Sequence, residues 1–378
     1  MRLVKVGGSP YEIGLQYGEQ CQKEIRRLIP LLYLITSRTQ MPDFQAGKLK
    51  LSYSILSLLT YRWGRNKIRR RVKDFEAYLS KFCPELKREM EGIALGAKVK
   101  YEEVLFLNAW CDLTFGFPGC SGWMACGGAT RSGDTLIGMN FDYIKLVAGH
   151  LVILEVKPSQ GYKFIGVTLA GSLGPISGMN EKGLAGGGSA LYLRSREQAS
   201  VPSLALSNMI YTHCSNVTEF LEMYQRFPRP LLGLAEIFVD KRRGVRLESS
   251  ATAYSIEEIE DGFAITANHS TSEALKDFDL ITQMSPFLQT NTFLRYKRLS
   301  ELLSERYGEL DEKFMMELAR DHGITGKTGI CQHLGSTFLR VPLLGIQSLF
   351  SLIAKPSELK LWIAPGPPCR HQFREFSL

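Results

Sequence analysis

The spacing of apolar residues changes along this chain, and the change divides it into two parts. Between Ile13 and Leu32, and again between residues 51 and 79, apolar residues recur every three or four positions, which predicts amphipathic helices. From residue 120 onward, short β-rich runs separated by glycine turns predict strands. These runs span residues 134–140, 151–156, 164–169 and 263–267. We therefore expect the architecture to change between Gly119 and Cys120.

Four further helices are expected within the β-rich part. They span residues 203–212, 217–226, 292–305 and 312–321. A β-rich body with helices in blocks implies sheets that are covered by helices, which is an α+β fold. We expect residues 1–119 to form a mostly helical segment and residues 120–378 to form a second domain.

The net charge of +8 is unevenly distributed. Residues 1–119 hold 20 Lys and Arg against 12 Asp and Glu, whereas residues 120–378 hold 26 of each kind. The densest basic run lies between Arg62 and Lys73, and such a run can attract nucleic acid or an acidic surface. We favour a solvated helix face, because the run carries no nucleic-acid motif and no interleaved aromatic residues. No nucleic-acid partner is therefore expected.

The eight cysteines are scattered through the chain without a Cys-x-x-Cys pair. This spacing predicts neither a disulfide framework nor a metal site, because Cys331-x-His333 has no second matching pair. No cofactor is expected. Residues 1–8 lack the apolar core of a signal peptide, and the apolar stretch from Val341 to Ala354 is too short to cross a bilayer. We expect a cytoplasmic protein with no membrane partner.

Cys120 opens a stretch that predicts a β-hairpin. A strand follows Cys120, Ser132-Gly133-Asp134 predicts a tight turn, and a returning strand leads to Asp142. Because the turn lies close to midway between Cys120 and Asp142, both residues are expected near the open end of the hairpin, where their side chains can meet.

The same stretch contains Gly119-Cys120 followed by Asn140-Phe141-Asp142, and it resembles the acyl-coenzyme A:6-aminopenicillanic acid acyltransferase family, the C45 cysteine peptidases. Precursors of that family split before a Gly-Cys cysteine, and an Asn-aromatic-Asp motif follows. Further blocks of the family pattern occur in the expected order over nearly the whole chain. They are Tyr11-Glu12-Ile13-Gly14 with Tyr17-Gly18, Gly178-Met179-Asn180-Glu181-Lys182-Gly183-Leu184, Thr266-Ala267-Asn268-His269, Arg295-Tyr296-Lys297-Arg298-Leu299, Asp321-His322 with Ile330-Cys331-Gln332-His333, and Gly366-Pro367-Pro368-Cys369.

The resemblance implies an αββα N-terminal-nucleophile hydrolase sandwich that cleaves itself between Gly119 and Cys120. Residues 1–119 would then be a pro-segment, or small subunit, that stays docked on the catalytic domain. Asp142 would hold the α-ammonium group of the new N-terminus. Asn268 would donate its side-chain amide to the oxyanion. Arg295 would lie near the nucleophile and favour its thiolate.

Self-cleavage would supply the base that the thiol needs. A free thiol has a pKa of about 8.5 and is only slightly ionised at neutral pH. The α-amino group released on Cys120 has a reference pKa of about 7.7 to 8.0 and lies on the same residue as the sulfur. No histidine base is then required, so His322 and His333 are expected to be structural.

The chain also departs from the family pattern. Related bile-salt and penicillin V hydrolases carry arginine where Met139 stands, and the asparagine that often follows the central block falls near Ser189 or Ala190. The hydroxyl of Ser189 is therefore the candidate for a second oxyanion donor. Phe141 and Tyr143, together with Trp123 and Leu191, suggest an apolar lining that accepts an uncharged or aromatic acyl group.

Three functions remain open on the sequence. The first is a self-processing cysteine amidohydrolase that cleaves the C–N bond of a small-molecule amide or thioester substrate through a Cys120 thioester. The second is an acyl-CoA-dependent N-acyltransferase of the same fold, although Gly186-Gly187-Gly188 lacks the following helix of a phosphate-binding loop. The third is a non-catalytic module that binds nucleic acid or a membrane surface through its basic amino-terminal segment. We favour the first.

Overall fold

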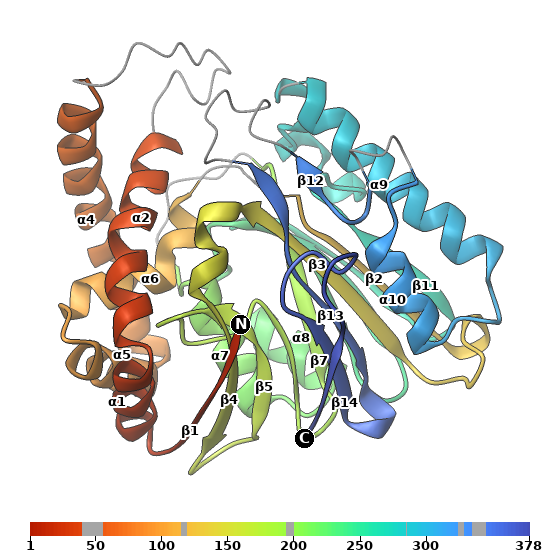
Figure 1. The fold of residues 1–378 in the computed structure, drawn as a ribbon, viewed down its shortest axis with the longest axis horizontal. Coiled ribbons are helices and arrows are strands. Elements are labelled where there is room, and N and C mark those ends of the chain that lie inside the picture. Colours follow the sequence, from red (N-terminus) through yellow and green to blue (C-terminus); the bar gives the residue numbers. More distant parts are fainter. Residues whose placement is uncertain (40–55, 115–118, 194–199, 285, 324–328, 335–344) are drawn as a thin grey trace.

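Two sheets lie face to face at the centre of the molecule, and helices cover the outer side of each (Figure 1). The computed structural model describes residues 1–39, 56–114, 119–193, 200–284, 286–323, 329–334 and 345–378. Its four layers follow the order helix, sheet, sheet, helix. The predicted αββα architecture of the α+β class is therefore confirmed.

The first sheet has eight strands in the order β1-β4-β5-β6-β7-β8-β9-β10. Its strands are β1 (Arg2–Gly8), β4 (Leu151–Pro158), β5 (Phe164–Leu169), β6 (Ser177–Asn180), β7 (Ala185–Leu191), β8 (Gly233–Val239), β9 (Gly244–Ser249) and β10 (Tyr254–Ile259). The edge strand β1 pairs in parallel with β4, and the other neighbours are antiparallel. The amino-terminal segment, which was predicted to be mostly helical, thus also contributes a strand to this sheet.

The second sheet carries the hairpin that was predicted after Cys120. Its path is β11-β2-β3-β13-β14-β15, with β12 paired to β13 beside it. The strands are β2 (Ser121–Cys126), β3 (Leu136–Ile144), β11 (Gly262–Thr266), β12 (His333–Leu334), β13 (Ile346–Lys355), β14 (Lys360–Ala364) and β15 (Arg374–Ser377). In the hairpin, Ser121 pairs with Asn140 and Ala125 pairs with Leu136, so its open end lies at Cys120.

Helices cover both outer faces. On the first sheet lie α7 (Ser203–His213) and α8 (Val217–Arg226), and Phe220 of α8 stacks on Phe238 of β8 with ring centroids 4.3 Å apart. On the second sheet lie α9 (Pro286–Glu305) and α10 (Glu312–Arg320). These four helices are the ones predicted from periodicity, and their ends agree to within one residue except that α9 begins six residues earlier than predicted. Short 3-10 turns lie at Gly127–Ala129, Lys145–His150, Glu273–Phe278, Ile281–Gln283 and Pro356–Glu358.

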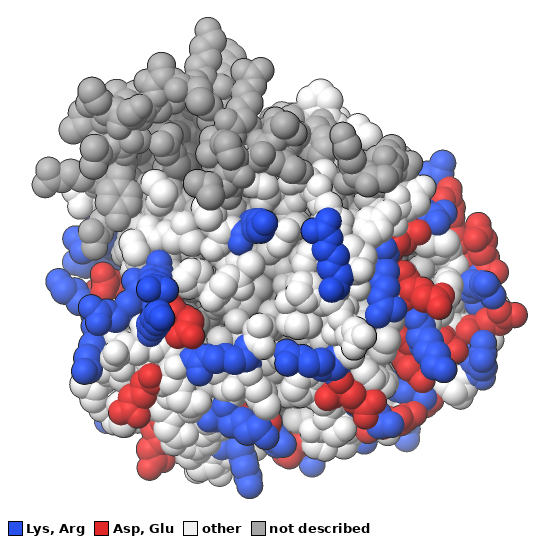
Figure 2. Space-filling model, viewed as in Figure 1, with Lys and Arg blue, Asp and Glu red and all other residues white. Residues whose placement is uncertain are grey.

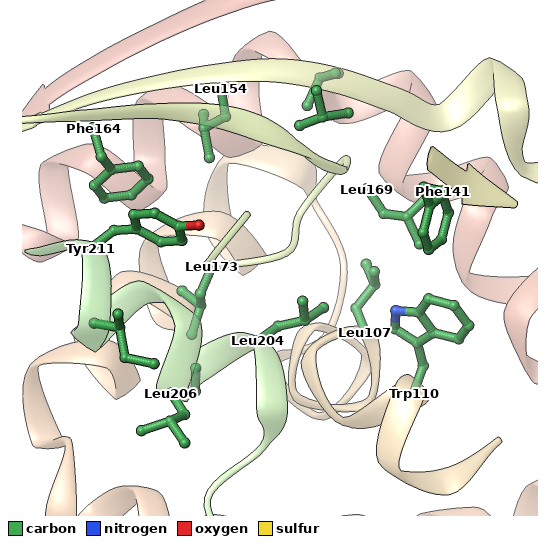
Figure 3. Packing of buried hydrophobic residues seen from close by; sticks show 14 of the residues in the cluster. Leu107, Trp110, Phe141, Leu154, Phe164, Leu169, Leu173, Leu204, Leu206 and Tyr211 are labelled. Carbon is green, nitrogen blue, oxygen red and sulfur yellow. The ribbon is translucent and has the colours of Figure 1, made fainter. Parts of the chain in front are cut away.

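The remaining helices gather at one end of the sandwich (Figure 1). They are α1 (Pro10–Gln20), α2 (Gln22–Thr39), α4 (Leu56–Phe82), α5 (Pro84–Ala97) and α6 (Tyr101–Leu113). Leu107 and Trp110 of α6 lie beside Phe141 and Leu169 of the two sheets (Figure 3). The amino-terminal helices therefore share one apolar core with the sandwich.

The basic run of α4 lies on an amphipathic helix. Arg69, Arg70 and Lys73 are exposed, whereas Ile68 and Val72 are buried. In the view of Figure 2, Lys and Arg mix with Asp and Glu over the right-hand part of the described surface, and the middle of the face is mostly uncharged. Among the described helices, none combines the length and the apolarity that a membrane crossing requires.

Helices α1 and α5 cross in direct backbone contact through two pairs of glycines. A Cβ atom on Gly14 would lie 1.9 Å from the carbonyl oxygen of Glu89, and one on Gly18 would lie 2.5 Å from that of Ile93. Gly92 and Gly96 of α5 meet α1 in the same way, at 2.3 and 2.4 Å. Because these neighbours are backbone atoms that cannot rotate away, only glycine fits. The Gly14 and Gly18 positions of the amino-terminal block thus have a packing role.

We expect Gly14→Ala to destabilise the protein by about 1 to 3 kcal/mol or more, because the added methyl group overpacks the helix crossing. The usual effect of this change inside a helix is a gain of up to about 1 kcal/mol, so the sign is diagnostic. Gly149→Ala is the matched control, since a Cβ atom there meets nothing within 4 Å. Denaturant unfolding measures both variants, and equal stabilities would contradict the packing argument.

Candidate active site

Cys120 lies at the open end of the hairpin, directly before β2, and is 4% exposed. Its Sγ atom lies 3.9 Å from the carbonyl oxygen of Asp142, so the structure brings the two residues together. Burial, followed by the nearby charge of Asp142, raises the pKa of the Cys120 thiol to about 12. The thiol of the intact chain is therefore protonated at neutral pH.

Asp142 is fully buried, and its two carboxylate oxygens have different surroundings. Oδ1 accepts a 2.6 Å hydrogen bond from the Ser348 hydroxyl. Oδ2 has no hydrogen-bond donor within the described part of the chain. Burial raises the pKa of Asp142 to about 7, although the charge of Arg295 and the Ser348 bond act in the opposite direction. A buried carboxylate with an unpaired oxygen is costly, which makes Asp142 a candidate for binding a cation.

Gly119 fits against the side chain of Asp142. A Cβ atom at this position would lie 2.9 Å from Cβ and 3.3 Å from Oδ2 of Asp142. Contacts of this length leave little room for a side chain. The absence of a side chain thus brings the backbone at the Gly119–Cys120 bond next to the unpaired oxygen.

Arg295 of α9 bonds to two other segments of the chain and to a residue of its own helix. Its side chain is fully buried, and its Nη1 atom donates to the Cys120 carbonyl oxygen at 2.6 Å. Nη2 donates to Oδ1 of Asn268 at 2.7 Å, and Nε donates to Oδ1 of Asn291 at 3.0 Å. Burial lowers the pKa of Arg295, while the Asp142 charge raises it. This guanidinium therefore places positive charge close to the thiol. Met139, at the position where related hydrolases carry arginine, is buried between the sheets and carries no charge.

The contacts of Asn268 orient its amide group. Because Oδ1 accepts from Arg295, the Nδ2 atom points the other way and donates to the carbonyl oxygen of Ala190 at 2.9 Å. An amide nitrogen carries two hydrogens, so one remains for an oxyanion. Ser189, next to Ala190 on β7, is fully buried, and its hydroxyl has no partner among the described residues. It shares a strand face with Gly187, which meets Met139 of the opposite sheet.

The aromatic residues near the hairpin separate onto two faces. Phe141 stacks on Phe350 with centroids 5.3 Å apart and on Tyr143 at 6.0 Å, and Trp110 meets Tyr143 edge-on at 5.4 Å. These rings lie in the core between the sheets. Trp123 instead packs over Gly138 in the cluster under α9 and α10. The prediction that Trp123 shares a lining with Phe141 was wrong, because alternate residues of a strand face opposite sides. Leu191 belongs to a third cluster.

Several polar residues of the site were not predicted. Ser348 links Gln332 to Asp142, because its hydroxyl accepts from the Gln332 backbone and donates to Asp142. Asn291 donates to the Gln332 side chain and accepts from Arg295. Asn140 was recognised only as part of a motif, and its amide donates to the backbone of Ala319 and Ile330. Ser348 lies 206 positions from Asp142, so no local pattern could have indicated the contact.

Neither histidine that was considered as a base contacts the thiol. The contacts described for Cys120 involve Asp142 and Arg295 and no histidine. His322 and His333 instead lie together, with ring centroids 5.2 Å apart, beside Cys331 and Cys369. The Gly186-Gly187-Gly188 run lies within β7, where Gly186 makes room for the Phe238 ring, and not at a helix N-terminus.

Comparison with known proteins gives a family and several more distant similarities. The sequence model of the family described as acyl-coenzyme A:6-aminopenicillanic acid acyl-transferase matches residues 129–326. The match includes Asp142, Ser189, Asn268 and Arg295 and begins after Cys120. A relative from Archaeoglobus fulgidus, described as an uncharacterized protein, is 23% identical. The similarity covers 96% of this chain and 63% of that protein, so the chain spans less than two thirds of its relative.

Solved structures of three hydrolases are also similar at low identity. The Caenorhabditis elegans N-acylethanolamine-hydrolyzing acid amidase ortholog is 14% identical with a TM-score of 0.44, over 68% of this chain and 100% of that one. A conjugated bile acid hydrolase mutant from Clostridium perfringens is 11% identical with a TM-score of 0.44, over 68% and 97%. Penicillin V acylase from Agrobacterium tumefaciens is 13% identical with a TM-score of 0.42, over 65% and 83%.

We expect the buried charge of Asp142 to destabilise the intact chain as pH rises. Its pKa of about 7 lies above the value of about 3.9 in an unfolded chain, so the folded chain holds the proton more tightly. The contribution of the Asp142 carboxyl to stability is therefore fully present below about pH 4, and it is lost as pH rises through 7. Asn at position 142 still accepts from Ser348 but carries no charge.

The measurement compares Cys120→Ala with Cys120→Ala/Asp142→Asn, because both chains lack the thiol. Between pH 5 and 8, the single variant should lose about 2 kcal/mol more stability than the double variant. Other buried acids, such as Glu89 and Glu236 with pKa values raised to about 8 by burial, are present in both chains and cancel. Parallel stability profiles would show that Asp142 is not buried as a costly charge.

Proposed function

Because the chain belongs to the acyl-coenzyme A:6-aminopenicillanic acid acyl-transferase family, we propose that it is a self-processing cysteine amidohydrolase with Cys120 as its nucleophile. One observation carries the proposal. The unpaired Oδ2 atom of Asp142 is buried against Gly119, next to the bond whose cleavage would create an α-ammonium group. A buried carboxylate oxygen without a donor is unfavourable, and a new cation beside it would remove the penalty.

The proposed cleavage begins with an acyl shift. The Cys120 sulfur attacks the Gly119 carbonyl carbon, an S–C bond forms, the C–N bond breaks, and the nitrogen of Cys120 takes up a proton. Water then hydrolyses the thioester and releases the Gly119 carboxylate. Arg295, bonded to the Cys120 carbonyl oxygen, holds the backbone on the other side of the nucleophile.

After cleavage, the same residue would hold both nucleophile and base. The α-amino group takes the thiol proton when substrate is attacked and returns it to the leaving amine. Asp142 keeps the ammonium in place, and its charge is then balanced. Asn268, fixed in orientation by Arg295, donates to the oxyanion, and Ser189 is the candidate for a second donor.

The aromatic rings on the inner face support a small-molecule amide with an apolar acyl group. Phe141 stacks on Tyr143, Trp110 meets Tyr143 edge-on, and Tyr143 lies close enough to Cys120 for their charges to interact. Trp110 comes from the amino-terminal segment, so this segment would contribute to substrate binding if it stays docked as the small subunit. The pairing of β1 with β4 supports continued docking, because seven residue pairs hold the two parts together. A cytoplasmic location stays a prediction from the sequence.

An acyl-CoA-dependent N-acyltransferase is the second candidate, and the family description favours it. The thioester on Cys120 would then be transferred to an amine instead of water. The glycine run that was considered for phosphate binding lies inside β7, which favours hydrolysis. A non-catalytic nucleic-acid or membrane module would leave the chain uncleaved and give salt-sensitive binding.

Purified protein should consist of two fragments, one of which begins at Cys120. Cys120→Ala should remain a single folded chain, because the attacking sulfur is absent. Cys126→Ala is the matched control, since Cys126 is also buried in the hairpin but bonds to the carbonyl oxygen of Ile259. Intact mass and amino-terminal sequencing give the result. A different new terminus, or cleavage that depends on Cys126, would exclude this mechanism.

Hydrolysis by the cleaved enzyme should rise with pH through a single ionisation at roughly pH 7 to 8.5, because the α-amino group must be neutral to accept a proton. Asn268→Ala should lower kcat by roughly 100- to 1,000-fold with the same profile, since it removes a donor and not a titrating group. Asp142→Asn should lower it by orders of magnitude. A shift of about one pH unit in Asn268→Ala would reverse the assignment of roles.

A further inference from the structure

A second cluster of reactive side chains lies behind the hairpin. His322, Cys331, His333 and Cys369 each offer one atom that can bind a metal, and these atoms all lie within 4.8 Å of one another. From the chemistry and spacing of this set, we propose that the four residues bind one zinc ion that clips the carboxyl-terminal segment to the back of the active site.

Two of the three distances within the cluster are close to the edges of a zinc tetrahedron, and the third is about 0.5 Å shorter than its edge. With Zn–S bonds of about 2.3 Å and Zn–N bonds of about 2.0 to 2.1 Å, two sulfur ligands lie about 3.8 Å apart and a sulfur and a nitrogen about 3.5 Å apart. The two sulfur atoms of Cys331 and Cys369 are 3.7 Å apart. Nε2 of His333 lies 3.4 Å from the first sulfur and 3.0 Å from the second. His322 completes the set.

The ligand types favour zinc over harder cations. Two cysteines and two histidines form a tetrahedral S₂N₂ set, whereas Mg²⁺ and Ca²⁺ prefer oxygen ligands. Two thiolates also balance the charge of Zn²⁺. Four protein ligands leave no open position for a substrate or water, so the ion has a structural and not a catalytic role.

The cluster joins three segments of the chain. His322 follows the end of α10, Cys331 lies two residues before β12 and His333 is the first residue of that strand, and Cys369 lies in the turn between β14 and β15. The expectation that no metal binds rested on the missing second pair beside Cys331-x-His333. That reasoning considered local spacing only, and folding supplies the remaining ligands from 9 residues before and 38 residues after Cys331.

The ion would hold a segment that supports the nucleophile. Cys331 and His333 flank Gln332, whose side chain accepts from Asn291 and whose backbone donates to Ser348. Ser348 in turn donates to Asp142. A zinc ion bound by the residues on both sides of Gln332 would therefore fix the hydrogen bonds from Gln332 through Ser348 to the Asp142 carboxylate. None of the four metal ligands contacts the Cys120 thiol.

Cys369→Ser is the sharpest test, because Cys369 is exposed and its sulfur contributes little to the core. His371→Ala is the matched control, since His371 is an exposed residue of the same turn outside the cluster. Each protein is purified with a non-chelating reductant and its zinc is measured by elemental mass spectrometry. Cobalt substitution gives a second readout through the sulfur-to-cobalt charge-transfer absorption.

The full chain and His371→Ala should each contain about one zinc ion, whereas Cys369→Ser should lose most of it, together with the cobalt charge-transfer band. A chelator should lower the Tm of the full chain by about 5 °C or more and leave that of Cys369→Ser unchanged. The proposal would be overturned if the full chain contained no metal although all four ligand side chains were chemically intact. A Cys331–Cys369 disulfide in the intact mass, or zinc that persists in Cys369→Ser, would also overturn it.

Discussion

The buried guanidinium of Arg295 is the interaction on which the site depends. It donates to the backbone of Cys120 before β2, to Asn268 two residues after β11 and to Asn291 one turn earlier on α9, and no contact is longer than 3.0 Å. A buried cation is costly unless it is paired and hydrogen-bonded, and here each of the three guanidinium nitrogen atoms donates to an oxygen. The same bonds orient the Asn268 amide and place positive charge near the Cys120 thiol. One side chain, Arg295, therefore sets both the orientation of the Asn268 amide and the positive charge near the thiol.

Asp142, the buried acid near this cation, has a hydrogen-bond donor on only one of its two oxygens among the described residues. Asp142 has one oxygen bonded to Ser348 and one oxygen without a donor in the described chain. Its pKa of about 7 and the thiol pKa of about 12 both reflect burial of groups that would be ionised at lower cost in water. An additional cation beside Oδ2 would lower the pKa values of both groups. In the intact chain, burial thus disfavours ionisation of both the thiol and the carboxyl, in keeping with the proposed need for cleavage.

The boundary at Gly119–Cys120 divides the sequence but not the folded core. Strand β1 forms the edge of the first sheet, and α6 packs Leu107 and Trp110 against residues of both sheets. The crossing of α1 and α5 is close enough that backbone meets backbone at Gly14 and Gly92. The amino-terminal part is therefore a structural component of the sandwich. Its removal would expose apolar surface along one whole end.

The sequence by itself determined the local structure and the main chemical candidates. Periodicity located α7, α8, α9 and α10, and the spacing around the turn placed Cys120 and Asp142 at one end of a hairpin, because local patterns decide local pairing. The strand β1 was missed, since its partner β4 begins about 150 residues later and an edge strand carries a weak pattern. Only the tertiary structure decided the roles of Ser348, Gln332 and Asn291, which acquire partners from distant segments. It also separated Trp123 from Phe141 and gathered two histidines and two cysteines, because residues far apart in sequence become neighbours only when the layers close.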